Sequence, residues 1–307
     1  MTSSINAHNR KVHILDLEFM GFPGTIAAYL IPHEQGLILI ECGPASTLKS
    51  LQKSLLKHGY QLEDISAVLL THIHLDHAGS AGALSRLGAS IYVHRIGAPH
   101  LLYPDKLLSS AARIYGDTME ELWGETLPVI PDRLIAIQDG EVVDIDGLCF
   151  RAIDTPGHAN HHLAYIFQDT CFSGDIAGVR LFGLPHLRFP MPPPELHLEK
   201  WRKSLNQLMD EDFSYIAPTH FGIYQDPHSH LGKLYEQLEI TEQWIYNTMQ
   251  AKPTSEELST KLNQWIQTLS HEDGLSQEQI DAYEIVNPSW MSALGIFRYW
   301  QKYRANR

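Results

Sequence analysis

The segment THIHLDHAGS, residues 71–80, crowds four side chains that can bind a metal into six positions: His72, His74, Asp76 and His77. Divalent metals such as zinc take imidazole nitrogens and carboxylate oxygens as ligands at about 2.0–2.2 Å. His72 and His74 are two residues apart, so both side chains project to the same side of an extended backbone. The spacing predicts two adjacent ions, with the histidine pair serving one and Asp76 with His77 serving the other.

A single histidine in a polar loop is ordinarily a solvated side chain. The H-x-H-x-D-H pattern, directly after the apolar run ISAVLL, favours coordination over solvation. Four groups do not complete two sites, so further ligands are expected where other strands end beside Gly or Pro, because a rigid sheet positions such loops accurately. The candidates are His158 in DTPGHANHH, Asp175 in CFSGD, where Gly174 permits close backbone approach, and His220 in IAPTHFG.

The apolar runs around these groups predict the elements that position them. Residues 65–70 are continuously apolar, as expected for a strand buried on both faces. Further strand-type runs broken by Gly and Pro occupy residues 13–19, 25–31, 36–42 and 89–94. Residues 46–59 have apolar positions at helical spacing with Gly59 as the C-cap, and residues 106–124 predict another helix.

The second half of the chain begins with β-type runs at residues 133–137, 141–145, 148–154, 163–168 and 171–174. Asp146 and Gly147 mark a hairpin turn between the second and third of these runs. Residues 179–195 contain five prolines and cannot form a helix or a central strand. A helix at residues 195–209 and a strand at residues 213–218 are expected to follow.

The remainder of the chain is polar and largely helical, with breaks near Pro253, Gly274 and Pro288. Strands followed by helices, repeated twice and ending in this tail, predict two sheets packed face to face with helices outside. We therefore expect a catalytic domain over residues 1–228 and a helical extension over residues 229–307 that packs on it.

Composition narrows the range of functions. At 307 residues, with 44% hydrophobic and 19% charged residues, the chain fits a soluble globular protein. No apolar run reaches the roughly 20 residues that span a bilayer, and the N-terminus lacks the layout of a signal peptide, so we expect a cytoplasmic protein without a membrane partner. The net charge of −13 disfavours a nucleic-acid partner, because phosphate binding needs a basic surface. Three cysteines form no CxxC pair, whereas eighteen histidines are a compositional hint of metal.

The motifs THIHLDHAG, TPGH, FSGD and PTHFG, in this order, resemble the metallo-β-lactamase superfamily, in its hydrolase branch related to glyoxalase II. They run from about residue 71 to 222, and the flanking strands extend the likeness over nearly the first 230 residues. The stretches GAPHLLYPDKL and PPPELHLEKW are similar to a group of bacterial and archaeal proteins described only as metal-dependent hydrolases. The resemblance implies an α+β fold, a four-layer αββα sandwich, here with a C-terminal helical extension.

The resemblance also implies a ligand set for two divalent ions. One ion would be held by His72, His74 and His158, the other by Asp76, His77 and His220, with Asp175 bridging both. Zinc is the expected metal, although these ligands accept iron and manganese as well. A metal-bridging hydroxide would then cleave an ester-like bond in a small-molecule substrate, namely a thioester, a lactone or a related carboxylic ester. Asp76 is expected to act in catalysis as well as in metal binding.

Several positions depart from the family pattern or lie beside it. Glu41 stands where the family usually has an aspartate that supports the ligand loop, and its longer side chain is expected to reach the same loop. His162 matches the second histidine of T-P-G-H-x-x-G-H and is a candidate support for a ligand, whereas His161 replaces the glycine and is expected at the surface. His100 and Tyr224 are candidate substrate contacts.

Two further expectations concern the rest of the chain. The histidines expected to be solvated are His94, His186, His228 and His230. Residues 179–194 are expected to form the rim of the active-site cleft together with the C-terminal helices. The apolar members of this segment, Phe182, Leu184, Leu187 and Phe189, would form a substrate wall or a subunit interface, or else would simply pack under the helical tail.

Other functions remain open at this point. A sulfur dioxygenase with a single iron uses a similar ligand set, and a non-enzymatic protein could combine a structural metal site with a partner-binding tail. The charge disfavours a nuclease, the missing secretory signal disfavours a β-lactamase proper, and the helical tail offers no flavodoxin-like domain for a diiron reductase. A homodimer is one assembly that the sequence leaves open.

Overall fold

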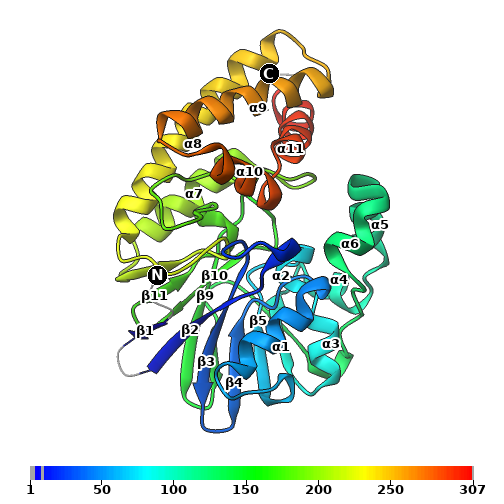
Figure 1. Cartoon of the computed structure of the whole chain (residues 1–307), viewed down its shortest axis with the longest axis vertical. Coiled ribbons are helices and arrows are strands. Elements are labelled where there is room, and N and C mark those ends of the chain that lie inside the picture. Colours follow the sequence, from blue (N-terminus) through cyan, green and yellow to red (C-terminus); the bar gives the residue numbers. More distant parts are fainter. Residues whose placement is uncertain (1–3, 8–9, 306–307) are drawn as a thin grey trace.

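Two β-sheets form the centre of the molecule (Figure 1). The computed structural model describes residues 4–7 and 10–305. The first sheet has the strand order β1 (Ser4–Ala7), β2 (Arg10–Asp16), β3 (Ala27–His33), β4 (Gly36–Ile40), β5 (Ile65–Leu69), β6 (Ser90–His94), β7 (Leu134–Ile137). The second has the order β12 (Tyr215–Ala217), β11 (Thr170–Phe172), β10 (Leu163–Phe167), β9 (Leu148–Asp154), β8 (Val142–Ile145).

Helices cover the sheets and form the C-terminal end of the chain. They are α1 (Leu48–Leu56), α2 (Leu75–Ala78), α3 (Ala81–Arg86), α4 (Ala98–Leu102), α5 (Asp105–Tyr115), α6 (Met119–Trp123), α7 (Leu198–Met209), α8 (Pro227–Gln250), α9 (Ser255–Glu272), α10 (Gln277–Val286) and α11 (Ser289–Tyr303). None of the helices in the described part of the chain is long and apolar enough to cross a membrane.

Alternation along the strands builds four layers. In β4, Leu37 and Leu39 point outward into a core shared with α1 and α3, whereas Ile38 and Ile40 point into the core between the two sheets. In β10, Tyr165 and its alternate neighbours face the first sheet, and the residues between them face α7 and α8. Strands buried on both faces explain why the apolar runs are continuous. The predicted αββα sandwich is confirmed.

The turns between these elements follow the sequence closely, with one exception. Asp146 and Gly147 both have positive φ, 54° and 76°, and join β8 to β9 in the predicted hairpin. The single helix expected over residues 106–124 is wrong. Gly116, with φ 54°, ends α5, and α6 begins three residues later. With α4, these short helices form a separate flank of the molecule (Figure 1).

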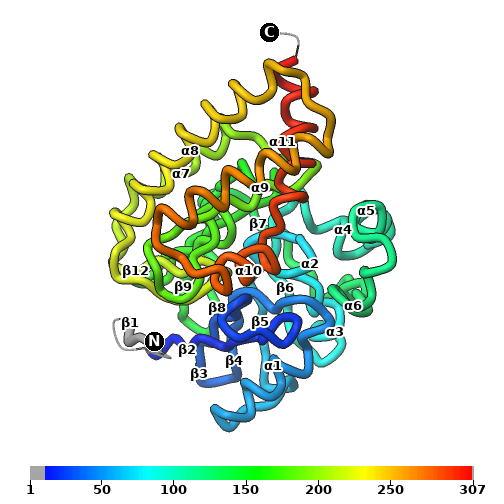
Figure 2. The backbone as a smooth tube through the Cα atoms, turned by 45° about the horizontal axis from the view of Figure 1, so that its top comes forward, coloured from blue at the N-terminus to red at the C-terminus, as the bar shows by residue number. Residues whose placement is uncertain are grey.

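The C-terminal region is helical, with breaks where the sequence predicts them: α8 ends before Pro253, α9 before Gly274 and α10 before Pro288. It packs through α8, whose buried leucines share a core with α7 and the second sheet. Both views show α10 near the middle of the molecule and α11 running from it toward the C-terminal end at the top (Figures 1 and 2). Because α8 begins at Pro227, the predicted boundary between residues 228 and 229 falls in its first turn, and the division into two domains stays a prediction.

Candidate metal centre

The loop between β5 and α2 presents the first histidines. Residues 70–74 leave the buried strand β5 in irregular backbone before α2 begins at Leu75. His72 Nε2 lies 2.9 Å from His74 Nδ1, so the two rings converge as the spacing predicts. His77 lies within the short helix α2 and is fully buried, as is His72.

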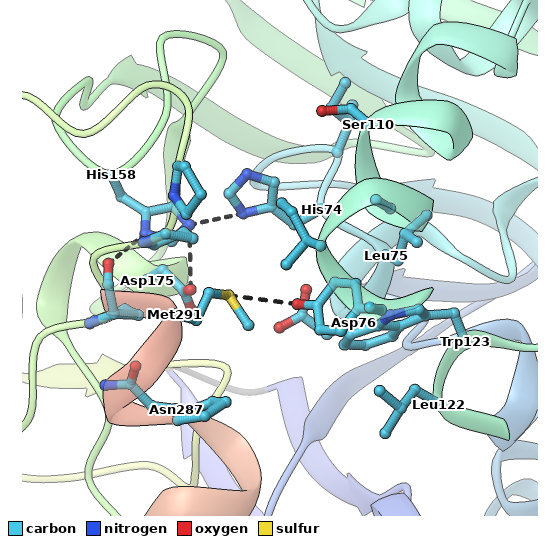
Figure 3. Close-up of a pocket in the computed structure, with 18 of the residues that line it drawn as sticks. His74, Leu75, Asp76, Ser110, Leu122, Trp123, His158, Asp175, Asn287 and Met291 are labelled. Carbon is cyan, nitrogen blue, oxygen red and sulfur yellow. Dashed lines mark hydrogen bonds and ion pairs between the residues drawn. The ribbon is translucent and has the colours of Figure 1, made fainter. Parts of the chain in front are cut away.

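A third histidine joins this pair from the second sheet. His158, in the loop after β9, places its Nε2 2.8 Å from His74 Nδ1 (Figure 3). Its Nδ1–H donates to the carbonyl of Pro190 at 2.8 Å, which leaves Nε2 with a free lone pair. Burial lowers the pKa of His72, His74 and His158, so all three rings are neutral and can act as ligands.

A second trio lies next to the first. Asp76 Oδ2 is 3.6 Å from His77 Nε2 and 3.5 Å from His220 Nε2, and His220 follows β12 on the second sheet. His220 Nδ1–H donates to the carbonyl of Thr25 at 3.0 Å, again leaving Nε2 to face Asp76. Burial opposes ionisation of Asp76, but His77 and His220 outweigh it and lower the pKa of Asp76 to about 2. Asp76 is therefore a carboxylate at neutral pH.

Asp175 lies between the two trios and turns one carboxylate oxygen to each. Its Oδ2 is 3.4 Å from His158 Nε2, whereas its Oδ1 is 3.4 Å from His77 Nε2 and 3.5 Å from His220 Nε2. The side chain is almost entirely buried. Burial disfavours its charge, but the three surrounding histidines, His77 first, hold the pKa of Asp175 well below its usual range.

The two trios and Asp175 form one cluster, and two of its atoms lack the partners that bound cations would supply. His77 Nε2 and Asp175 Oδ1 are buried and have no hydrogen-bond partner. Buried polar atoms in native proteins are nearly always satisfied, and each exception needs an explanation. Asp76 and Asp175 bring two negative charges into this buried cluster, and divalent cations at the two trios would satisfy the orphaned atoms and neutralise that charge.

Glu41 supports the ligand loops through hydrogen bonds to His77 and to residues beside the other ligands. It is fully buried, and its carboxylate accepts hydrogen bonds from the Thr71 hydroxyl, from His77 Nδ1–H at 3.0 Å and from the Thr219 hydroxyl at 3.1 Å. The longer side chain in place of aspartate therefore reaches the loops before both His72 and His220. Thr71 and Thr219, which directly precede those histidines, were not singled out in the sequence, although their places in THIH and PTH were visible.

His162 holds the backbone of Asp175. The amide of Asp175 donates to His162 Nε2 at 3.1 Å, so the His162 proton is on Nδ1, which donates to the Thr155 hydroxyl at 2.7 Å. Gly174 makes this approach feasible: it has φ 52°, and a Cβ there would lie 2.6 Å from both His162 Nε2 and Thr71 Oγ1. These contacts bring Asp175 to its position between the trios.

Four other histidines are buried, contrary to expectation. His161 is 7% exposed and packs beside His74, with Nε2 3.4 Å from Glu195. Three of the histidines expected in solvent, His94, His186 and His230, are each less than 3% exposed. The rings of His186 and His230 bond to oxygens of Asp273 and of the Ala177 carbonyl. The His94 Nδ1 accepts from the Ile96 amide at 3.0 Å, and its Nε2 lies 3.2 Å from an Asp154 oxygen. His228 is exposed as predicted.

A cavity of about 440 Å³ opens directly onto the cluster (Figure 3). Its floor includes His74, Asp76, His158, Asp175 and His220, and its walls come from α5 and α6 on one side and from α10, α11 and the proline-rich loop on the other. His100 on α4 lines this cavity, as expected for a substrate contact, and so does His161. Tyr224 is not among the lining residues, because its hydroxyl donates to the Arg180 carbonyl at 2.6 Å.

The proline-rich segment forms part of the rim, but not through the residues expected. Leu187 and Phe189 are buried in the core under the C-terminal helices, and Phe182 and Leu184 pack at the edge of the core between the sheets. None of these four lines the cavity, so the expected apolar wall is wrong at these positions and the residues pack instead inside the fold. The segment contributes Pro190 and the prolines of residues 192–194 to the rim.

Comparison with known proteins finds a matching family and several relatives. The sequence model of the metallo-β-lactamase superfamily matches residues 21–220. A metallo-β-lactamase fold-containing protein of Sulfurisphaera tokodaii is 25% identical over 218 residues, 70% of this chain and 79% of that protein. A hydroxyacylglutathione hydrolase of Rhodopseudomonas palustris is 32% identical over 124 residues, 40% of this chain and 36% of the enzyme. The chain thus spans little more than a third of that enzyme's length.

A solved structure extends the likeness beyond the region that the family model matches. A metallo-β-lactamase family protein of Thermus thermophilus has a TM-score of 0.70 and 20% sequence identity, covering 95% of this chain and 93% of the other. An alignment over that much of the chain includes most of the C-terminal helices. At this identity it shows a shared fold.

Proposed function

The chain belongs to the metallo-β-lactamase superfamily, and on that premise we propose that it is a metal-dependent hydrolase with two metal ions that cleaves an ester-like bond: a thioester, a lactone or a related carboxylic ester. The observation that supports two ions is the carboxylate of Asp175, whose two oxygens face different trios. The hydroxyacylglutathione hydrolase among the relatives supports an acyl-transfer reaction to water.

The residues of the chain divide into ligands and reacting groups. The two ions would be held by His72, His74 and His158, by Asp76, His77 and His220, and by Asp175 between them. When bound, two divalent ions lower the pKa of water to about 7 and polarise a carbonyl oxygen. The small-molecule substrate would enter the cavity above the cluster. Zinc is the first metal to test, and iron and manganese are the alternatives.

Of the two carboxylates among the proposed ligands, Asp76 has the better access to a reacting molecule. It lines the cavity and its side chain is 20% exposed, against 4% for Asp175. Because it stays ionised, it can accept a hydrogen bond from the attacking water and orient it toward the carbonyl carbon. As the bond to the leaving atom breaks, the proton taken from that water passes to the leaving group through Asp76.

The proposal is tested by hydrolysis measured on the full chain, as isolated, after chelation and after zinc is restored. Matched thioesters, lactones and carboxylic esters form the panel, and oxygen uptake with a glutathione persulfide is followed in parallel. We expect hydrolysis of at least one class that chelation abolishes and zinc restores. Persulfide oxidation by a form with one iron, without hydrolysis, would instead establish the dioxygenase.

A further inference from the structure

The cavity above the cluster is walled mainly by apolar side chains. Helix α5 has an apolar face made by Leu107, Ala111 and Ile114, which lines the cavity, yet no residue of α5 is fully buried. An amphipathic helix normally covers its apolar face with protein. Here that face is left partly open toward the cavity, which leaves apolar surface for a ligand to cover.

Aromatic residues enclose one end of the same cavity. Tyr115 of α5 packs edge to face with Trp123 of α6, at 5.0 Å between ring centroids, and with Trp290 of α11, at 6.2 Å. The rings of Phe19 and Trp123 stack at 5.6 Å. The Tyr115 hydroxyl donates a hydrogen bond to the Met291 sulfur at 3.4 Å. This contact joins the two walls of the cavity, and Met291 lies close to Asp76 (Figure 3).

Polar residues also line the wall. Glu284 and Asn287, at the end of α10, bond to Arg188 and to the Phe189 carbonyl, so these contacts within the fold engage them. Ser110 lies on the side of His74 in Figure 3, whereas Leu122 and Trp123 lie on the side of Asp76. Lys106 of α5 and His100 of α4 also line the cavity. A small molecule that reacts at the cluster thus meets an apolar, aromatic enclosure and a separate polar group of side chains, a division that fits an amphipathic substrate.

From this division we propose that the substrate is an ester or thioester with an apolar chain on one side of the scissile bond, and that the chain lies between α5–α6 and α10–α11. This inference rests on the proposed function, because it names the substrate class of the same site. The apolar chain would cover the open face of α5 and the rings of Trp123 and Trp290, and the polar part would face Ser110 and Lys106.

The substrate series that tests the proposal varies one apolar group at a time. Ethyl esters and N-acetylcysteamine thioesters from acetyl to octanoyl lengthen the acyl side, and alkyl acetates from ethyl to octyl lengthen the alcohol side. We expect kcat/KM to rise along one of the two series by up to about fourfold for each methylene group that becomes buried. Hydrolysis with a flat or falling dependence in both series would overturn the apolar site but leave the hydrolase in place. Absence of hydrolysis throughout would count against the proposed function itself.

A pair of variants locates the effect. Ala111→Trp fills the cavity from α5, whereas Ala112→Trp places the same side chain at the neighbouring exposed position, which does not line the cavity. Ala111→Trp should reduce kcat/KM for the octanoyl or octyl substrate by roughly tenfold or more relative to the acetyl or ethyl member. Ala112→Trp should leave kcat/KM unchanged for both the long and the short substrate. Equal losses in both variants, or none in Ala111→Trp, would overturn the placement.

Binding gives a readout that needs neither metal nor turnover. Octanamide should bind the metal-free full chain more tightly than acetamide in isothermal titration calorimetry, and Ala111→Trp should weaken octanamide binding while Ala112→Trp does not. Equal affinity of the wild-type chain for the two amides would contradict the apolar site whatever the outcome of the hydrolysis assays.

Discussion

His77, His158 and His220 each direct one ring nitrogen to a fixed acceptor and the other toward Asp175. The acceptors are the Glu41 carboxylate and the carbonyls of Pro190 and Thr25. A donor on Nδ1 makes Nε2 the nitrogen that is left to bind a metal once it carries no proton, so the hydrogen bonds outside the cluster fix which atom can bind. At the scale of single residues, the site is therefore organised by atoms that never touch a metal or a substrate.

Asp76→Asn should separate metal binding from turnover. The amide keeps the size and one oxygen of the side chain, but it loses the charge and cannot carry a proton to the leaving group. We expect kcat to fall at least about 100-fold on an ester with a poor leaving group and less on one with a good leaving group, because the latter needs little protonation. Near-normal kcat on the poor-leaving-group ester, with metal content retained, would contradict the role of Asp76.

Glu41→Gln should weaken metal binding while leaving the volume of the side chain almost unchanged. The glutamine has nearly the same shape, and its carbonyl oxygen can replace Oε1, which accepts from His77, Thr71 and Thr219. It loses the charge that faces His77 Nδ1–H, and its NH₂ group takes the place of Oε2, which accepts from the Thr71 amide at 3.4 Å. We expect metal affinity to fall about 10- to 100-fold, measured by competition with a chromophoric chelator. Glu34→Gln, at an exposed loop position, is the matched control. Equal affinities in the two variants would show that Glu41 does not tune the ligands.

At the scale of elements, the sequence predicts whatever depends on local pattern. The buried strands, the hairpin at Asp146 and Gly147 and the breaks between the C-terminal helices follow from apolar periodicity and from residues with special backbone preferences. Burial of His94, His186 and His230 could not be predicted in this way, because each ring lies against an oxygen from another part of the chain. The cavity walls could not be predicted for the same reason, because α5 and α6 lie opposite α10 and α11, which are far away in the sequence.

An ion pair connects the proline-rich loop to α10 and should be important for stability. The Arg188 guanidinium is 4% exposed and lies 2.6 Å from the Glu284 carboxylate, which is 25% exposed. Glu284→Gln would leave the buried arginine without its partner charge, and we expect the free energy of unfolding to fall by about 2 kcal/mol, less than for a fully buried pair. Denaturant unfolding measures this loss.

The double variant Arg188→Met with Glu284→Leu provides the control for that experiment. Removing both charges leaves no unpaired group, so it should destabilise the protein less than Glu284→Gln alone. A double variant that loses as much free energy of unfolding as Glu284→Gln, or more, would contradict this role of the pair.

At the scale of the whole molecule, the ligands are spread over both sheets. His72, His74, Asp76 and His77 follow β5 of the first sheet, whereas His158, Asp175 and His220 follow strands of the second. The cluster forms only when the sheets pack face to face, so it lies at one edge of the core between them. The C-terminal helices then add the outer wall of the cavity, and this explains why one large fold is needed to build a site of a few side chains.

The central claim is that this edge binds two divalent ions bridged by Asp175. Its most direct test is the zinc content per chain, measured by mass spectrometry after equilibrium dialysis of the wild-type chain and of Asp175→Ala. We predict two ions in the wild-type chain and a loss of metal in the variant, because Asp175 is the residue that reaches both trios. A wild-type chain with one ion or none, or a folded variant that retains two, would contradict the claim.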